Sequence, residues 1–347
     1  PGSSIKPLIV YTPSFERGKT PDTIVNDHKF DGGPSNSGDS YYGDVTIRFA
    51  VQKSLNTVAW QLYDELTPKV GLQYLKDMNF TNIVKDDYVT ATALGGFTTG
   101  VSTLEMASAY STLENDGMYR NPTCIKSIVD SDNNIIYTSS QKDTVIYTET
   151  ASRMMTDVMT DVMKSGTGRS ANLDNGMPCA GKTGTTSDYN DVWFSGYTPY
   201  YTATTWTGYD NNTKLRKGEE RNLAKKLWRA TMAKIHEELP SQSFTMPSGI
   251  VQATVCARSG KLPIAGLCDG TLKTEYFAEG NVPTESCNVH YQGPICQYTN
   301  LPASEQCPFK VEGVLEVTPA DDPLMSGDST LPEQQEPQTQ EIVNAVS

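Results

Sequence analysis

The chain has 347 residues, of which 37% are hydrophobic and 20% charged, a balance typical of a globular protein with a large buried core. No apolar run approaches the ~18 residues that a membrane-spanning helix requires. The net charge is −13, but residues 311–347 hold eight acidic residues and no Lys or Arg, which leaves 28 basic and 33 acidic residues before them. This mild acidity lacks the basic stripe that nucleic acid requires, so we expect no nucleic-acid partner.

The first half of the chain is predicted to be mainly helical. Residues 3–16 can start a helix, because Ser3 is a residue type that caps helices and Pro7 lies near the first turn, where few backbone donors are needed. Residues 17–44 are rich in Gly, Pro, Ser and Asp without a clear period, and we expect a long surface loop there. Helical periodicity then covers residues 45–64, 67–78 and 102–115, the last with Ser102 and Glu105 as a capping box.

The second half mixes strands and helices. A strand pattern over 124–147 contains "DSDNN", which is typical of a hairpin turn, and residues 149–165 return to a helical pattern. Three successive strands are predicted between 178 and 210. The helix predicted over 219–239 has an apolar stripe made of Trp228, Met232, Ile235 and Leu239. Helices followed by a meander that a further helix covers indicate an α+β fold.

The C-terminal part has a different composition. Neither a CxxC pair nor a neighbouring pair of histidines accompanies its cysteines, so local disulfides in an oxidising compartment are favoured over a zinc site. We expect residues 1–250 to form the main domain, 251–310 a Cys-rich extension and 311–347 an acidic, disordered tail. Five of the seven cysteines lie within 52 residues: Cys256, Cys268, Cys287, Cys296 and Cys307.

Two serine and lysine pairs with the spacing SxxK are candidates for a nucleophile beside its base. Residues i and i+3 of a helix share one face, so their side chains can come within hydrogen-bond reach. Ser3 and Lys6 lie at a predicted helix start, where the dipole favours developing negative charge, although a polar helix start explains them equally well in isolation. Ser139 and Lys142 lie in the predicted hairpin and are expected to be solvated.

Two further motifs also occur more than once. Lys164 begins a Lys-Ser-Gly sequence that ends a helix, whereas Lys182, Thr183, Gly184 and Thr185 lie on an apolar strand. A lysine and threonines at a strand edge can hold a substrate carboxylate, and a backbone N–H beyond them can hold an oxyanion; a solvated strand with a Gly bulge is the alternative. The copies of SxN are Ser54–Asn56, Ser131–Asn133 in the hairpin turn, Ser170–Asn172 and Ser286–Asn288.

Other catalytic classes find little support in the sequence. Only three histidines are present, His28 in the loop, His236 on a helix and His290 among the cysteines, which disfavours a Ser-His-Asp hydrolase. The motifs GxSxG and HExxH, a phosphate loop and a dinucleotide fingerprint are all absent. We therefore expect neither a cofactor nor a metal ion.

The order of the motifs at Ser3–Lys6, Ser54–Asn56 and Lys182–Thr185 resembles that of the penicillin-binding proteins. The likeness extends to longer segments over about residues 1–260 and is to the transpeptidase domain of the class A, bifunctional members. These segments are "PGSSIKP", "KSLNTVAWQL", "LGGFTTGVSTLEMASAYSTLENDGMYRNP", "GKTGTTSDYNDVWFSGYTP" and "WTGYDN". SLN here replaces the SDN of the β-lactamases.

The resemblance implies a role for each residue of the first two motifs. Ser3 would attack the carbonyl of the penultimate D-Ala of a D-Ala-D-Ala stem peptide, and Lys6 would be its base. Ser54 would pass a proton to the leaving amine, and Asn56 would hold Lys6 and the substrate amide.

The same resemblance assigns substrate binding to the third motif. Lys182 would supply positive potential, and Thr183 and Gly184 would complete the site. Thr185 would receive the substrate carboxylate, and its backbone N–H would hold the oxyanion together with that of Ser3.

The family also implies the reaction, the partners and the location. A D,D-transpeptidase passes the acyl group to an amine of a second stem peptide, a D,D-carboxypeptidase passes it to water, and a β-lactam sensor keeps it. A β-lactamase needs a deacylating base, and nothing identifies Glu105 or Glu114 as one. The implied partners are peptidoglycan stem peptides and β-lactam antibiotics, at the extracytoplasmic face of the bacterial cell membrane.

The fold implied by the resemblance is the β-lactamase/transpeptidase-like one, an antiparallel sheet flanked by helices. In the family, two of the five sheet strands precede the SxxK helix, and this chain starts at Pro1, directly before that motif. We therefore expect a partial transpeptidase domain without the first two strands, the glycosyltransferase domain and the N-terminal anchor, which would be its one contact with the membrane.

Overall fold

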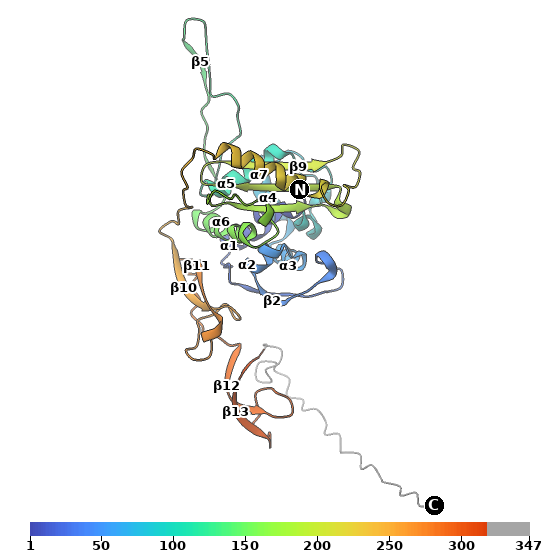
Figure 1. Cartoon of the computed structure of the whole chain (residues 1–347), viewed down its shortest axis with the longest axis vertical. Helices are drawn as coiled ribbons and strands as arrows, with labels where there is room; N and C mark the ends of the chain where they lie inside the picture. Colours follow the sequence, from blue (N-terminus) through green and yellow to red (C-terminus); the bar gives the residue numbers. More distant parts are fainter. Residues whose placement is uncertain (318–347) are drawn as a thin grey trace, which may run out of the picture. The chain divides into compact units, whose positions relative to one another are not determined.

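The computed structural model describes residues 1–317 and divides the chain into two units. The first unit comprises residues 1–262 and 271–285, and the described part of the second comprises 263–270 and 286–317 (Figure 1). No helix among these residues is long and apolar enough to cross a bilayer.

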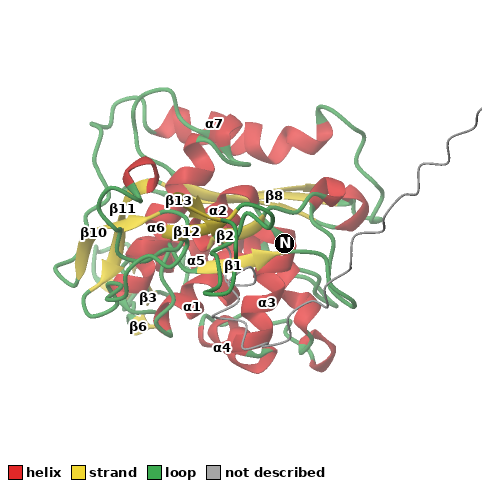
Figure 2. Ribbon diagram, turned by 90° about the horizontal axis from the view of Figure 1, so that it is seen from below, coloured by secondary structure: helices red, strands yellow, loops and turns green. Residues whose placement is uncertain are grey.

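The central layer of the first unit is a three-stranded antiparallel sheet. Its strands β7 (Ala180–Thr185), β8 (Asp191–Tyr197) and β9 (Thr202–Gly208) are neighbours in sequence order, which confirms the meander predicted between 178 and 210. In Figure 2 the helix α7 (Leu223–Ile235) lies on one side of the sheet and most of the other helices lie on the opposite side. The structure is therefore α+β, as the order of elements predicted.

Six helices build the layer on the other face of the sheet. They include the predicted helices after residues 67, 102 and 149, and Ser102 and Glu105 form the expected capping box. The helices are α1 (Thr12–Glu16), α2 (Ile47–Lys53), α3 (Asn56–Leu66), α4 (Pro68–Asp77), α5 (Thr103–Glu114) and α6 (Glu149–Lys164). Short 3₁₀ turns at residues 85–87 and 90–94 lie between α4 and α5, and one at 169–171 lies between α6 and β7.

β8 is buried on both faces because helices pack on each side of it. Alternate side chains of a strand point to opposite faces. Phe194 packs against Trp228 of α7, with ring centroids 5.0 Å apart, whereas Trp193 and Tyr197 belong to the larger core on the other side. The predicted stripe of α7 is correct for Trp228 but wrong for Ile235, which is 44% exposed at the end of the helix.

Three N-terminal predictions need correction. Residues 2–16 are helical, but they comprise a 3₁₀ turn (Gly2–Ile5), a π turn (Pro7–Tyr11) and α1. The predicted loop over 17–44 contains β1 (Ile24–Asp27), which pairs with β2 (Gly43–Thr46). The helix predicted over 45–64 is two helices, because the chain turns at Ser54.

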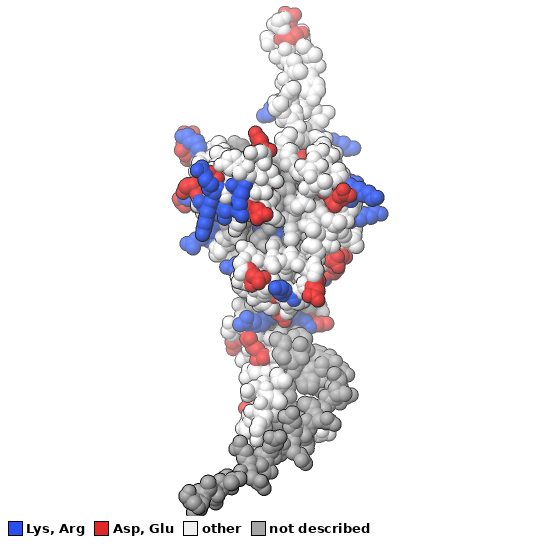
Figure 3. All heavy atoms as spheres, turned by 90° about the vertical axis from the view of Figure 1, so that its right-hand side faces the viewer, with Lys and Arg blue, Asp and Glu red and all other residues white. Residues whose placement is uncertain are grey.

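The predicted hairpin with the "DSDNN" turn is confirmed. Strands β4 (Ser127–Val129) and β5 (Ile135–Thr138) pair antiparallel and project from the rest of the unit (Figure 1). At the turn the Asp130 carboxylate accepts hydrogen bonds from the backbone of Asp132 and Asn134. Figure 3 shows this projection as mostly uncharged, with acidic residues at its tip. Below it, β3 (Met118–Tyr119) pairs with β6 (Thr144–Val145).

The Cys-rich segment forms two antiparallel hairpins. β10 (Ile250–Cys256) pairs with β11 (Leu272–Ala278) in the first unit, and β12 (His290–Cys296) pairs with β13 (Lys310–Glu316) in the second. β13 occupies the start of the stretch for which the sequence predicts a disordered tail. The remainder of that predicted tail, residues 318–347, lies outside the described residues.

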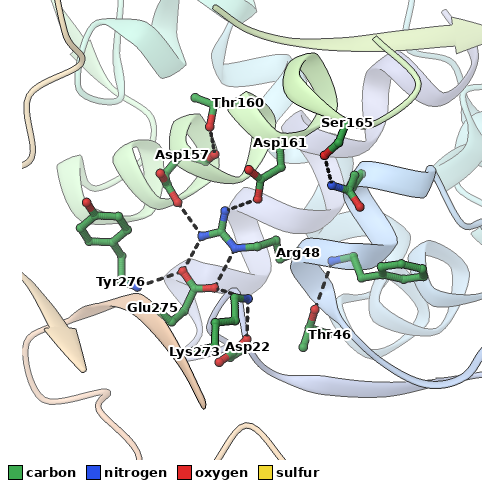
Figure 4. Close-up of polar contacts among 12 residues, drawn as sticks. Asp22, Thr46, Arg48, Asp157, Thr160, Asp161, Ser165, Lys273, Glu275 and Tyr276 are labelled. Carbon is green, nitrogen blue, oxygen red and sulfur yellow. Dashed lines mark hydrogen bonds and ion pairs between the residues drawn. The ribbon is translucent and has the colours of Figure 1, made fainter. Parts of the chain in front are cut away.

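An ion-pair cluster around Arg48 joins α2, α6 and β11 (Figure 4). The Arg48 guanidinium contacts the carboxylates of Asp157, Asp161 and Glu275, and Glu275 also pairs with Lys273 at 2.9 Å. Burial opposes ionisation of Glu275, but the hydrogen bonds and charge of Arg48 outweigh it and lower the pKa of this carboxyl. The β10–β11 hairpin is therefore fastened to the helix that leads to Ser54.

Replacing Arg48 by Met is expected to lower the free energy of unfolding by about 3–5 kcal/mol, because the buried Glu275 and the partly buried Asp157 and Asp161 lose a shared counter-charge. The matched control is Arg216→Met, whose ion pair with Glu220 involves an Arg side chain that is 84% exposed. Its loss should stay below about 1 kcal/mol. Urea unfolding of the full chain, followed by tryptophan fluorescence, measures both. Equal losses in the two variants would contradict the role given to the Arg48 cluster.

Candidate active site

One cleft of the first unit, about 1480 Å³ in volume, is lined by residues of all three predicted motifs. Ser3, Ser54, Asn56, Thr183 and Thr185 border it. The other SxxK pair, Ser139 and Lys142, does not line the cleft and follows the exposed strand β5. The structure thus brings together the copies that the sequence favoured.

Ser3 lies inside the first 3₁₀ turn, and this corrects its expected role as a helix cap. The turn is packed directly on β7: the backbone of Gly2, at φ +55°, lies so close to the backbone of Thr185 that an added Cβ would come within 2.5 Å of the Thr185 oxygen. On its other side the Gly2 N–H donates to Gly95 O at 3.3 Å. Glycine at this position therefore allows the turn bearing Ser3 to approach the strand bearing Thr185.

Lys6 is fully buried and its ammonium has three oxygen partners. Nζ donates to Ser54 O at 3.0 Å, to Leu55 O at 3.0 Å and to Asn56 Oδ1 at 2.8 Å. A lysine ammonium has three N–H donors, so these partners engage all of them. The structure describes no hydrogen bond between Lys6 Nζ and Ser3 Oγ, although the SxxK spacing predicted such a contact.

The turn at Ser54 is what presents these acceptors. Ser54 has left-handed backbone angles (φ 63°, ψ 38°) and separates α2 from α3, which begins at Asn56. Such a conformation costs a non-glycine residue about 1–2 kcal/mol and is often retained at functional sites. Here it directs two carbonyl oxygens and one side-chain oxygen from three successive residues to a single lysine.

Lys182 approaches the same turn from the sheet. It is fully buried on β7, and its Nζ donates to Ser54 Oγ at 2.7 Å and to Thr183 O at 3.2 Å. Ser54 is thus bound through its carbonyl by Lys6 and through its hydroxyl by Lys182. The hydroxyl of Thr183, in turn, lies 2.8 Å from that of Thr167.

Burial changes the acidity of both lysines. Desolvation lowers the pKa of Lys182 to about 7. Desolvation and, in addition, the charge of Lys182 lower the pKa of Lys6 well below its ordinary value. Each lysine therefore loses its proton more readily than a solvated lysine, and the repulsion between the two charges disfavours the state in which both are protonated.

A hydrogen-bond network that holds Asn56 could not be predicted from the sequence, because it comes from the segment predicted as a surface loop. Asn36 accepts from the Asn56 N–H at 2.7 Å and donates to the buried Asp27 carboxylate at 2.7 Å. Asp27 also accepts from the Thr57 hydroxyl and from the Tyr42 N–H. These bonds hold Asn56 so that its amide oxygen faces Lys6. The loop has no hydrophobic periodicity, so its sequence gave no signal for them.

Aromatic residues line the far side of the cleft. Trp193 and Trp206 lie on paired strands with ring centroids 6.4 Å apart, and Trp206 donates to Asp191 at 2.9 Å. Tyr189 carries the Arg221 guanidinium 3.7 Å above its ring. Among the described residues, the group of His, Cys, Asp and Glu side chains close enough to hold a metal ion lies outside this cleft.

Known proteins share sequence with most of this chain. Residues 1–233 match the family described as "Penicillin binding protein transpeptidase domain". The chain belongs to this family. Residues 246–292 match a second family, "Penicillin-binding protein 1A, C-terminal domain". The resemblance to penicillin-binding proteins predicted from the motifs is therefore confirmed.

Curated relatives and solved structures of penicillin-binding proteins extend the comparison. The chain is 33% identical over 333 residues to penicillin-binding protein 1A of Clostridium botulinum (90% of this chain, 40% of the relative). It is 36% identical over 236 residues to penicillin-binding protein 4 of Bacillus subtilis (67% and 38%). The chain thus spans about two fifths of the length of these relatives.

The fold is shared with penicillin-binding proteins of known structure. Penicillin-binding protein 1A of Haemophilus influenzae superposes with a TM-score of 0.70 at 23% identity, covering 82% of this chain and 48% of that one. The PonA1 protein of Mycobacterium tuberculosis, solved in complex with penicillin V, gives 0.65 at 23% identity (71% and 72%). The β-lactamase/transpeptidase-like fold expected from the resemblance is confirmed.

Gly2→Ala is expected to lower the free energy of unfolding by about 2–4 kcal/mol, because the new Cβ combines backbone strain with overlap on Thr185. Gly18→Ala is the matched control: Gly18 also has positive φ (+88°), but nothing lies within 4 Å of its added Cβ. Its loss should be about 1 kcal/mol. Thermal unfolding of both variants measures the difference, and equal losses would show that the approach of Gly2 to β7 is not tight.

Proposed function

We propose that this chain carries the D,D-transpeptidase site of a peptidoglycan-synthesising serine acyltransferase. The main observation behind the proposal is the arrangement around Ser54. Lys6 and Lys182 both donate hydrogen bonds to Ser54, and the turn bearing Ser3 borders the same cleft. Membership of the family supports the reaction class, and the relatives described above are penicillin-binding proteins.

In the acylation step Ser3 Oγ forms a bond to the carbonyl carbon of the penultimate D-Ala. Neutral Lys6 accepts the hydroxyl proton, and its lowered pKa makes that form available. To become neutral, the Lys6 ammonium must lose one proton and, with it, one of its three hydrogen bonds. The nitrogen then has a lone pair that can accept the proton of Ser3. Asn56 Oδ1 then keeps the amine in place.

The tetrahedral intermediate collapses when the peptide C–N bond breaks and D-Ala leaves. Its amine needs a proton, and the Ser54 hydroxyl can deliver one and be reprotonated by Lys182, to which it is already bonded at 2.7 Å. The oxyanion would lie between the backbone N–H groups of Ser3 and Thr185. The packing of Gly2 on Thr185 supports this pairing, because it sets the two backbones side by side.

Substrate binding falls to the edge of β7. Lys182 gives the site a positive potential, and Thr185, which is exposed in the cleft, would receive the terminal carboxylate of the stem peptide. Thr183 and Gly184 form the adjoining strand edge, and Gly184 leaves no room for a side chain because Pro1 O lies 2.0 Å from the position of its Cβ.

The second half of the reaction transfers the acyl group from Ser3 to an amine of another stem peptide. Water as acceptor would instead make the protein a D,D-carboxypeptidase, and retention of the acyl group would make it a β-lactam sensor. β-Lactams resemble the D-Ala-D-Ala end and would acylate the same serine. With this substrate, the site would lie at the extracytoplasmic face of the bacterial cell membrane.

Ser3→Ala is expected to abolish covalent labelling by a fluorescent penicillin, because the attacking hydroxyl is lost. Ser139→Ala, in the decoy SxxK pair, should label like the unmodified chain. Gel fluorescence and peptide mass spectrometry of the labelled chain identify the modified residue. A label on any residue other than Ser3 contradicts the proposal.

The products distinguish the remaining functions. A transpeptidase yields a cross-linked dimer from a D-Ala-D-Ala donor and an amine acceptor, whereas a carboxypeptidase yields the shortened donor alone. Labelling without either product would identify a sensor.

The rate of penicillin acylation is expected to rise with pH as Lys6 loses its proton and to fall above about pH 7 as Lys182 loses its charge. Lys182→Arg keeps the charge at all these pH values, so the alkaline decline should move to higher pH. Lys234→Arg, on an exposed ion pair of α7, is the control and should leave the profile unchanged. An unaltered alkaline decline in Lys182→Arg would rule out Lys182 as its source.

A further inference from the structure

Three potential metal ligands meet inside the second unit, far along the chain from the catalytic motifs. Cys268 Sγ lies 3.4 Å and Cys287 Sγ 3.3 Å from His290 Nδ1. All three side chains are buried, and their ligand atoms lie within 4.8 Å of one another. Two sulfurs and an imidazole nitrogen at this spacing are the donor set of structural zinc sites.

The two ring nitrogens of His290 have different partners. Nδ1 faces the two sulfurs, and Nε2 lies 3.4 Å from Glu316 Oε1. Glu316 is directly opposite His290 in the β12–β13 register. A carboxylate on the second nitrogen is the usual partner of a metal-bound histidine, because it fixes the tautomer and raises the basicity of the ligating nitrogen.

A backbone turn surrounds the sulfur of Cys268. Ile264 N–H donates to Cys268 Sγ at 3.3 Å, and Cys268 N–H donates back to Ile264 O at 3.0 Å. This closed turn fixes the position of the sulfur and gives it a backbone N–H partner.

The described part of the second unit buries few side chains. Its described residues that are buried are Cys268, Cys287, His290 and Val317, so the ligand cluster takes the place of a hydrophobic core. Units of this size commonly need a metal ion or disulfides to fold. A metal bound here would fasten the 263–270 turn to the β12–β13 hairpin.

We propose that Cys268, Cys287 and His290 bind one structural Zn²⁺ ion. Binding converts two thiols to thiolates and releases two protons, with no change in oxidation state. A tetrahedral ion takes one further ligand beyond these three. The proposal replaces the sequence-based preference for disulfides, because His290, which a disulfide does not use, lies against both sulfurs.

The test is the zinc content of the full chain, purified with Zn²⁺ present and dialysed without chelator, measured by elemental mass spectrometry. About one zinc per chain is expected, and Co²⁺ in its place should give the visible bands of a tetrahedral site together with a sulfur-to-cobalt charge-transfer band. Cys268→Ser and His290→Ala should lose the metal, whereas His290→Cys should retain it.

Cys124→Ser is the matched control, since Cys124 is exposed and outside the cluster, and it should keep the full zinc content. Glu316→Gln should weaken binding about 10-fold or more without removing a ligand. If the variants fail to fold, the zinc content of the unmodified chain still tests the proposal. A zinc content near zero, equal content in His290→Ala, or a Cys268–Cys287 disulfide found by peptide mapping would each overturn the proposal.

Discussion

The candidate site depends on the three hydrogen bonds of the Lys6 ammonium. They join the helical start of the chain to the turn between α2 and α3, so that residues 48 to 50 positions apart in sequence become one site. Lys182 then adds the sheet to the same turn through Ser54 Oγ. A buried charge is costly unless it is hydrogen-bonded, and the partners that satisfy Lys6 are therefore also the groups that set its position and acidity.

Contacts to the helices on either side of Ser54 hold this turn in place. α2 carries Arg48, whose ion pairs reach α6 and the β10–β11 hairpin, while the Asp27 and Asn36 network holds the first residues of α3. A strained residue persists when its surroundings over-determine its geometry. The left-handed Ser54 meets this condition, because charged and amide contacts anchor the helices on both sides of it.

Much of the fold and of the site could be predicted from the sequence, and the limits have physical causes. Periodicity and capping located most helices and all three strands of the sheet, because these signals are local.

The break at Ser54 was missed, because the helical pattern of the sequence continues across it and tertiary contacts impose the turn. Likewise the spacing of Ser3 and Lys6 predicted a shared face, whereas Lys6 is drawn to the α2–α3 turn. The meeting of His290 with Cys268, 22 residues earlier in the chain, depends on tertiary folding, which no short motif encodes.

The projecting β4–β5 hairpin has a consequence for handling the protein. Its strands are exposed throughout, and large apolar side chains such as Ile135 (69% exposed) and Ile136 (67% exposed) lie on them next to unpaired strand edges. Edges of this kind accept a further strand from another molecule. Self-association through this hairpin is therefore expected in concentrated samples. Shortening it between residues 126 and 139, or adding lysines there, should reduce that association without changing the residues that line the cleft.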